Sequence, residues 1–215
     1  MDYCRRFLLM KLKKWEIALI CALVLTFLCG AALAKEQEDL SGKLIRLHVV
    51  ANSDSDEDQA LKLQVRDSIL EYLTALLEGT TDREKAVEII ESRMDSIVEV
   101  SEAVIREQGY GYQAAAIIAA EDFPTREYDT FSLPAGEYTS LRIVIGGGGG
   151  RNWWCVIFPP LCLSAATADS EAFRQLTDEQ IRLITSDEPE YVIKFKSIEW
   201  LNKIKTWLGL QGNKG

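Results

Sequence analysis

Hydrophobic and polar positions alternate strictly near the start of the polar part of the chain. In "LIRLHVVANSD", residues 44–54, the apolar Ile45, Leu47 and Val49 are interleaved with Arg46 and His48. This period of two is typical of a half-buried strand, and the polar residues after it indicate a turn. We therefore expect a strand that carries Arg46 and His48 on one face.

Two helical patterns follow this strand. The apolar positions of the first are Leu61, Val65, Ile69, Leu73 and Leu76, and those of the second include Val87, Ile90, Met94, Ile97 and Val104. Capping pairs precede both patterns: Asp54 with Glu57 or Ser53 with Asp56 for the first, and Thr81 with Glu84 for the second. Gly79 and Gly109 end them. The short link between them favours two long amphipathic helices packed antiparallel.

After Gly109 the period returns to that of strands. Residues 110–121, 139–146 and 152–158 are expected strands, and the run of five glycines at 146–150 is expected to form a flexible hairpin loop between the last two. Further on, the pattern favours a helix at 169–176, a second one from Thr177, and a strand followed by an amphipathic helix within 191–210.

This element order predicts an α+β fold. We expect a small mixed or antiparallel sheet with two long antiparallel amphipathic helices on one face and additional C-terminal helices. If one face is covered, the other presents Arg46, His48 and Arg142 towards solvent or a partner.

The N-terminus is typical of a secretory signal peptide. Basic residues precede the apolar run 17–34, which ends in "Ala-Leu-Ala" before the polar "KEQED", so cleavage is expected between Ala34 and Lys35. An uncleaved membrane anchor is the alternative, because the run approaches the length of a membrane span. We expect three parts: a signal peptide or anchor at 1–34, a polar linker at 35–43 and one extracytoplasmic domain at 44–215.

The charge of the chain argues against some partners. The formal net charge is −9, and without residues 1–34, which carry five basic and two acidic residues, it becomes −12. Such a surface repels nucleic acid and anionic membranes. Membrane contact is expected only through the signal segment or through the C-terminal helix around Trp207.

The expected exported part has two cysteines, Cys155 and Cys162. In an oxidising compartment such a pair favours a disulfide, and Pro159 and Pro160 between them favour a turn that brings them together. A cysteine nucleophile would need a base, for which His48 is the one histidine of the chain. The disulfide is the preferred interpretation, and a hydrolase that uses a cysteine or carboxylates remains the alternative.

Two other motifs favour structural roles. The acidic run at 54–58 lacks the glycine and glutamate that an EF-hand loop requires, so it is interpreted as a helix N-terminus. The glycine run has no lysine and no helix start, unlike a phosphate-binding loop. Adjacent strand residues point to opposite faces, so of Trp153 and Trp154 one is expected in the core and the other at a protein interface. No metal or cofactor is expected.

Three strings together closely resemble the stage II sporulation protein R family of endospore-forming bacteria. They are "IRLHVVANSDSDEDQALKLQVRDSIL", "EDFPTREYDTFSLPAGEYTSLRIVIG" and "NWWCVIFPPLC". The resemblance implies a signalling protein rather than an enzyme. Members of the family are exported from the forespore into the intermembrane space, where they trigger a membrane-embedded aspartic protease that processes pro-sigma-E.

The resemblance supplies no catalytic residues. We expect the extracytoplasmic domain to bind the protease and bias it towards an active state. The candidate contacts are His48, Asn52, Phe123, Arg126, Trp153 and Trp154.

Overall fold

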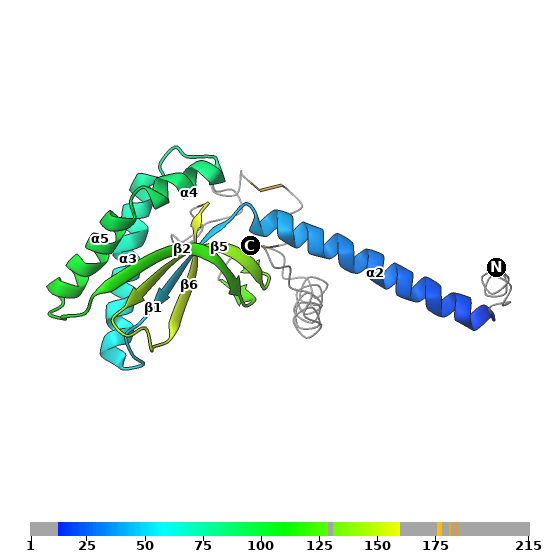
Figure 1. The fold of residues 1–215 in the computed structure, drawn as a ribbon, viewed down its shortest axis with the longest axis horizontal. Coiled ribbons are helices and arrows are strands. Elements are labelled where there is room, and N and C mark those ends of the chain that lie inside the picture. The colour runs from blue at the N-terminus through cyan, green and yellow to red at the C-terminus, as the bar shows by residue number, and fades with distance from the viewer. Residues whose placement is uncertain (1–12, 129–130, 160–175, 178–180, 182–183, 185–215) are drawn as a thin grey trace, which may run out of the picture. The chain divides into compact units, whose positions relative to one another are not determined.

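The structure is a computed structural model, and it describes residues 13–128, 131–159, 176, 177, 181 and 184 (Figure 1). The chain divides into two compact units, residues 1–36 and residues 37–215. Within the described residues, no helix has both the length and the apolar character required to cross a bilayer. The expected helix at 169–176, the elements within 191–210 and Cys162 lie outside the described residues, apart from Leu176.

The first helix, α2, runs from Lys14 to Ser41. Its last turn belongs to the second compact unit, and Leu40 in that turn is fully buried. Of the expected polar linker at 35–43, the residues as far as Ser41 are helical. The buried leucine holds this turn to the domain.

A mixed four-stranded sheet forms the centre of the second unit. Its strands are β1 (Ile45–Val50), β2 (Ala114–Phe123), β5 (Gly136–Ile145) and β6 (Asn152–Phe158), in the order β2-β5-β1-β6. Only the central pair, β1 and β5, is parallel. Two short strands, β3 (Arg126–Glu127) and β4 (Ser132–Leu133), form a separate pair. The expected α+β class and mixed sheet are thus confirmed.

Three helices, rather than the expected two, connect β1 to β2. They are α3 (Asp56–Leu76), α4 (Arg83–Glu91) and α5 (Met94–Glu107). The second expected helix is broken at Ser92 and Arg93, although its apolar spacing continues across the break. The Ser92 hydroxyl donates to the Ile89 carbonyl, and Arg93 has φ −120° and ψ 15°. A serine that bonds to its own backbone competes with the helical ladder, which accounts for the interruption.

The helix caps lie one or two residues later than expected. Ser55 is the N-cap of α3 and accepts from the Asp58 N–H, and Asp82 is the N-cap of α4 and accepts from the Lys85 N–H. Several adjacent Ser, Thr and Asp residues can each cap a helix, so local pattern alone does not select one.

The first core lies between the helices and one face of the sheet. It contains Leu47, Ile143 and Cys155 from three adjacent strands, and Ile69 and Ile97 from α3 and α5. Figure 1 shows α3, α4 and α5 gathered on the same side of the sheet. The apolar positions of the alternating strand pattern therefore point into this core, as expected.

The opposite face of the sheet, called here the second face, has its own core. It is formed by Leu40, Leu44, Phe123, Phe131, Leu133, Tyr138, Val156, Leu176 and Ile184. We expected Arg46 and His48 to point towards solvent or a partner, and this cover excludes solvent for both, since Arg46 is fully buried and His48 is 5% exposed. Arg142 is the more accessible member of the three, with its side chain 42% exposed.

β5 and β6 do not form the expected hairpin, because β1 lies between them. The glycine run crosses the end of β1 instead, and the N–H groups of Gly149 and Gly150 donate to the carbonyls of Asn52 and Ala51. A Cβ on Gly150 would collide with the backbone of Ser53. The glycines thus allow close packing of two backbones, and the run is a fixed crossing rather than a flexible loop.

Candidate partner-binding surface

The register of the sheet places polar and aromatic side chains in rows across the second face. One row joins Ile117, Arg142, His48 and Trp154, from β2, β5, β1 and β6. The next row joins Ala119, Ser140, Arg46 and Val156. Because the four strands are contiguous, residues from distant parts of the sequence meet here.

Four of the six predicted contact residues form one cluster on this face. The ring of His48 is stacked on Trp154 with centroids 3.9 Å apart, and Phe123 lies edge-on to Trp154 at 4.7 Å. The Arg126 guanidinium lies over the Trp154 ring at 5.9 Å. Phe123 is 2% exposed, Trp154 is half-buried and Arg126 is exposed. Arg126 and the edge of Trp154 are therefore the accessible parts of the cluster.

Arg46 lies beneath this cluster and was not among the predicted contacts. Its guanidinium lies 4.0 Å from the Phe123 ring centroid and 4.9 Å from that of Tyr138, and its Nη2 donates to Tyr128 Oη at 2.7 Å. Burial lowers the pKa of Arg46 from its usual value, although the hydrogen bond and the two tyrosines partly oppose this effect. Aromatic faces thus replace an anionic partner around this cation.

Glu121 connects two of the basic residues. Its Oε2 lies 3.2 Å from His48 Nδ1, and its Oε1 lies 3.4 Å from Arg142 Nη1. Because a carboxylate only accepts hydrogen bonds, the proton of this contact resides on His48 Nδ1. Glu121 thereby fixes the ring plane of His48 against Trp154.

Several polar atoms of the second face are buried without a hydrogen-bond partner in the described structure. They are Nε and Nη1 of Arg46, Nε2 of His48, Oγ of Ser140 and Nε of Arg142. Buried polar groups are normally paired, so a concentration of unpaired ones in two adjacent rows needs an explanation. Each unpaired group of this kind lowers stability, because its desolvation is not compensated by a hydrogen bond.

Asn52 lies away from this cluster, in the turn after β1. Its Nδ2 donates to Asp58 Oδ2 at 2.8 Å, and its Oδ1 accepts from the Gly147 N–H at 2.9 Å. The Ser53 hydroxyl donates to the same Asp58 oxygen at 2.5 Å. Hydrogen bonding from Ser53, and then from Asn52, lowers the pKa of Asp58 despite its burial. Asn52 therefore connects the glycine run to the start of α3.

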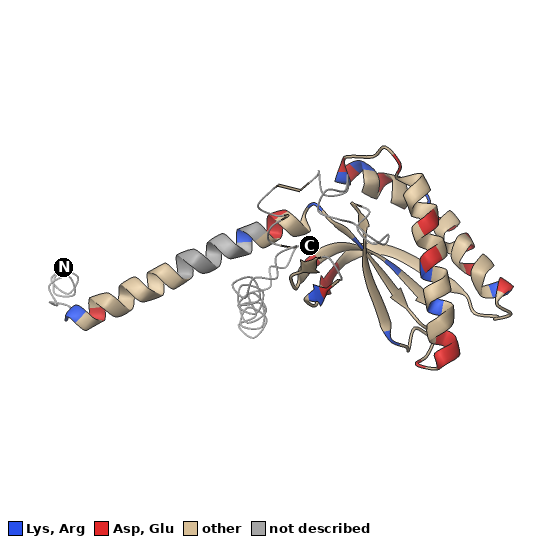
Figure 2. Ribbon diagram, turned by 180° about the vertical axis from the view of Figure 1, so that it is seen from behind, with Lys and Arg blue, Asp and Glu red and all other residues tan. Residues whose placement is uncertain are grey.

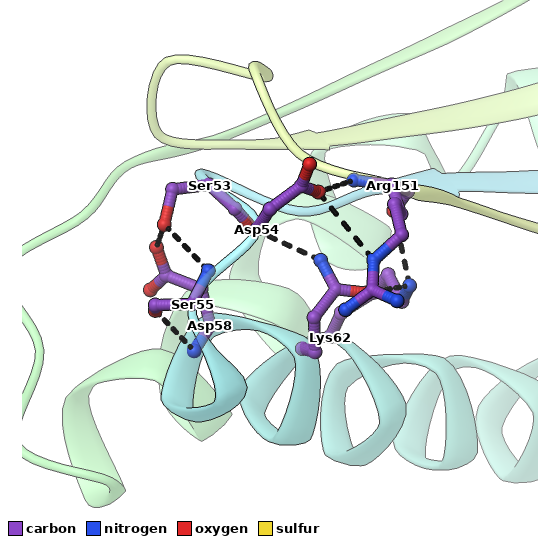
Figure 3. Close-up of polar contacts among 7 residues, drawn as sticks. Ser53, Asp54, Ser55, Asp58, Lys62 and Arg151 are labelled. Carbon is purple, nitrogen blue, oxygen red and sulfur yellow. Dashed lines mark hydrogen bonds and ion pairs between the residues drawn. The ribbon is translucent and has the colours of Figure 1, made fainter.

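The same turn is joined to the beginning of β6 (Figure 3). Asp54 accepts from the Arg151 N–H at 2.7 Å, and Lys62 Nζ donates to the Arg151 carbonyl at 3.0 Å. Desolvation by burial lowers the pKa of Lys62. The acidic run forms the first turn of α3, as the sequence predicted. In the described residues, no three His, Cys, Asp or Glu side chains gather as metal ligands would.

The two tryptophans lie on opposite faces, as the strand period requires, but neither is fully buried or fully exposed. Trp153 packs against the first core beneath the Arg66 guanidinium, which lies 4.2 Å from its ring. Trp154 packs against the second core. Each tryptophan thus packs against a core and is half-buried, so burial does not separate a core tryptophan from an interface one.

Cys155 is fully buried in the first core. His48 pairs in register with Trp154, the neighbour of Cys155, so the sheet itself separates the imidazole from the Cys155 sulfur. This pair cannot form the contact that a cysteine nucleophile and its base require.

Comparison with known proteins identifies the family. The model of the stage II sporulation protein R family matches residues 41–168. The chain belongs to this family. It is also 30% identical over 220 residues to stage II sporulation protein R of Bacillus subtilis (strain 168), which covers 88% of this chain and 98% of the relative. No solved structure matches it significantly. The family match contains β1 to β6, and therefore all four strands that form the second face.

Sequence reasoning placed Arg46 on the same face as His48 but did not name it as a contact, and it missed Glu121, Tyr128 and Tyr138 as neighbours of the predicted contacts. The strand period did place Arg46 on the polar face of β1. It did not show whether that face is exposed to solvent or covered by other residues. The residues that cover Arg46 come largely from 123–138 and from Leu176 and Ile184. The apolar residues of this covering layer follow no regular helical or strand period. The pattern therefore could not show that this face is covered.

Proposed function

We propose that this protein is an exported sporulation signal that activates a membrane-embedded aspartic protease. The protease processes pro-sigma-E and so couples gene expression in the mother cell to that in the forespore. The observation that carries this proposal is the family match over residues 41–168. The N-terminal segment 1–34 serves as the export signal, so the domain acts in the intermembrane space.

The second face supports a role in recognition. Unpaired buried donors and a half-buried tryptophan lie beside an exposed arginine there, and tryptophan and arginine are the residues most often found at the energetic centre of interfaces. Figure 2 shows acidic positions along the helices α3, α4 and α5, with basic positions between them. We infer that the protease contacts Arg126 and Trp154 directly, and that His48 and Phe123 hold the tryptophan in place.

Reconstitution tests the proposal directly. The purified secreted protein is added to the protease in lipid vesicles together with pro-sigma-E, and the processed sigma factor is followed over time. Cleavage should begin only after addition. If cleavage does not begin with a folded preparation, direct activation is wrong.

Alanine variants locate the contact. Arg126→Ala should lower the activation rate at least about tenfold, as expected for an interface residue that contributes about 1.4 kcal/mol or more. Arg93→Ala, an exposed arginine on the helical side, is the matched control and should activate normally. His48, Asn52, Phe123, Trp153 and Trp154 are replaced in the same way, and each variant is first checked for folding by urea unfolding. Normal activation by every folded variant would exclude this surface.

The second candidate function is an exported hydrolase, and the cysteines distinguish it. If Cys155 and Cys162 are bridged, Cys155→Ser and Cys162→Ser should reduce stability and signalling by similar, partial amounts. Complete loss at one cysteine alone, with stability retained, would indicate a nucleophile. The burial of Cys155 away from His48 favours the first outcome.

A further inference from the structure

The free edge of β2 is a feature that the proposed contacts leave unused. β2 is an outer strand of the sheet and spans ten residues, and its pairing with β5 continues without interruption from Ala114 to Phe123. In the described part of the chain, no strand pairs with its other side. A long regular edge of this kind presents a row of backbone donors and acceptors.

The hydrogen bonds identify which residues point outward. Gln113 O accepts from the Gly146 N–H, so Gln113 faces β5, whereas the Ala114 N–H donates to Glu102 Oε1 on the outer side at 3.3 Å. Backbone groups alternate along a strand. The outward N–H and C=O groups therefore belong to residues 114, 116, 118, 120 and 122.

The middle of this edge lacks the features that usually prevent strand addition. Residues 114–120, "AAAIIAA", contain no charge and no proline, and Ile117 is 55% exposed. The other outer strand differs, because its pairing with β1 shifts register near Ile45 and Arg46, and Pro159 follows its end. Natural proteins normally protect edges by such irregularities or by charged side chains.

We propose that the edge of β2 binds an extended segment of the protease partner, which adds to the sheet as a fifth strand. This inference rests on the proposed function. The segment carries small or apolar residues in its middle and basic residues at its two ends. Main-chain hydrogen bonds provide affinity in this mode of recognition, and alternate side chains provide specificity.

Charge at the two ends of the edge determines the occupant. Glu102, whose Oε2 also lies 3.7 Å from Arg106 Nη1, is at the Ala114 end, and the exposed Asp122 is at the other. In a second copy of this chain, the antiparallel register that pairs residues 114–120 with themselves sets Ala114 opposite Ala120. Asp122 would then lie opposite Tyr112, two residues beyond Ala114, at the end of the edge where Glu102 lies. Like charges would then meet at both ends, and both chains are negative overall. A segment with basic ends forms opposite-charge pairs at the same positions.

The added strand would extend the second face. Ile117 belongs to the same row as Arg142, His48 and Trp154, so an apolar residue beside Ile117 would cover its exposed side chain. On the other face, Ile118 already packs against the first core. The partner would thus contact the edge and the proposed tryptophan surface as one continuous area.

A peptide tests the edge without the protease. The probe is the synthetic peptide Lys-Thr-Val-Ala-Val-Thr-Val-Lys, and the control has glutamate at both ends. Amide exchange of residues 116, 118 and 120 in the secreted protein, followed by NMR, should slow by about tenfold or more with the basic probe and remain unchanged with the control. Protection without any peptide, together with a dimer in sedimentation, would show that a second copy occupies the edge. No protection with the basic probe would overturn the proposal.

A proline variant then connects the edge to signalling. Ala116→Pro removes an outward N–H that the sheet does not use, a position at which edge strands tolerate proline. Ala115→Ser, which changes an exposed side chain of the same strand outside the two polar rows and keeps every N–H, is the matched control. Folded Ala116→Pro should lose at least about tenfold in activation, equivalent to about 1.4 kcal/mol, and Ala115→Ser should not.

The two proposals fail differently. If the wild-type protein activates the protease and folded Ala116→Pro activates equally well, the edge proposal is wrong and the proposed function stands. If the wild-type protein does not activate the protease, the proposed function is wrong whatever the peptide result.

Discussion

Arg46 is the residue on the second face whose burial is hardest to explain by stability alone. It is fully buried, and two of its nitrogens have no hydrogen-bond partner in the described structure. The loss of hydration of its charge is offset by contacts with aromatic rings and by one hydrogen bond to a tyrosine hydroxyl. Removing a charge from water costs several kcal/mol unless it is paired well. A purely structural role would be filled as well by an apolar side chain.

We therefore expect Arg46→Met to keep or raise the free energy of unfolding, by up to about 2 kcal/mol, because an apolar chain of similar length needs no desolvation. Arg46→Lys, which keeps the charge but loses the planar contact with Phe123, should lower it. Urea unfolding at pH 7 measures both. A fall of more than about 2 kcal/mol for Arg46→Met would show that the guanidinium stabilises the fold. Loss of activation by a stable Arg46→Met would assign it to signalling.

For single residues, the sequence predicted the face of the sheet to which a side chain points better than it predicted what surrounds that side chain. The alternation of Arg46 and His48 with Leu47 correctly places them on one face, since the strand period fixes the side to which each residue points. It does not reveal that Phe123 and Tyr138 cover that face. Likewise, the two tryptophans were assigned to opposite faces correctly, but their equal half-burial depends on Arg66 and His48.

The start of α3 shows how one carboxylate can organise an element. Asp58 is 4% exposed and accepts hydrogen bonds from the side chains of Asn52 and Ser53, at the helix end where negative charge is favoured. Its neighbours lower its pKa, so the folded protein binds this proton more weakly than the unfolded chain. The contribution to stability is thus complete well above the unfolded pKa of about 3.9 and is lost as pH falls through the lower folded value.

Asp58→Asn should consequently lower the free energy of unfolding at pH 7 by about 1–2 kcal/mol, since a buried charged acceptor is lost. The difference from the wild-type protein should shrink as pH falls from about 5 towards 2. Urea midpoints across this range measure the effect. Asp56→Asn, at an exposed carboxylate of the same turn, serves as the control. A difference that is constant with pH would contradict the role assigned to the Asp58 charge.

The glycine crossing provides a second prediction for an element. Gly150→Ala should destabilise the protein by about 1–3 kcal/mol, because its Cβ would collide with the Ser53 backbone and force two segments apart. Gly147→Ala is the matched control: its Cβ would lie 3.6 Å from Asn52 Oδ1, an ordinary contact. Thermal unfolding of both variants distinguishes them. Equal stability would mean that the run is a flexible loop after all.

Elements were predicted more reliably than their connections. Strand and helix positions follow from apolar spacing, and β1, β2, β5 and β6 all overlap the expected segments. The break between α4 and α5 depends on the Ser92 hydroxyl and could not be found from a continuous apolar stripe. The order β2-β5-β1-β6 depends on a loop crossing that composition does not encode, because glycines permit a hairpin and a close crossing equally well.

At the scale of the whole molecule, the boundary between the two compact units adds to the interpretation of the N-terminus. The second unit begins at Gln37, two residues after the predicted new N-terminus at Lys35. Gln37 donates a hydrogen bond to the Ala135 carbonyl, and Leu40 is fully buried with Leu44 in the second core. Cleavage after Ala34 would therefore retain all the residues that the described part of the domain buries.

A chain that begins at Lys35 should accordingly fold with full stability, whereas one that begins at Lys43 should lose about 2–4 kcal/mol, because it lacks the buried Leu40 side chain. Urea unfolding of the two chains measures the difference. Leu40→Ala in the longer chain should reproduce most of the loss, which separates the side chain from the shortening itself. The mass of the protein recovered from secreting cells provides the companion measurement, and it should equal that of residues 35–215. Equal stability of the two shortened chains would place the true start of the domain at β1, and a recovered mass that includes residues 1–34 would favour a retained anchor.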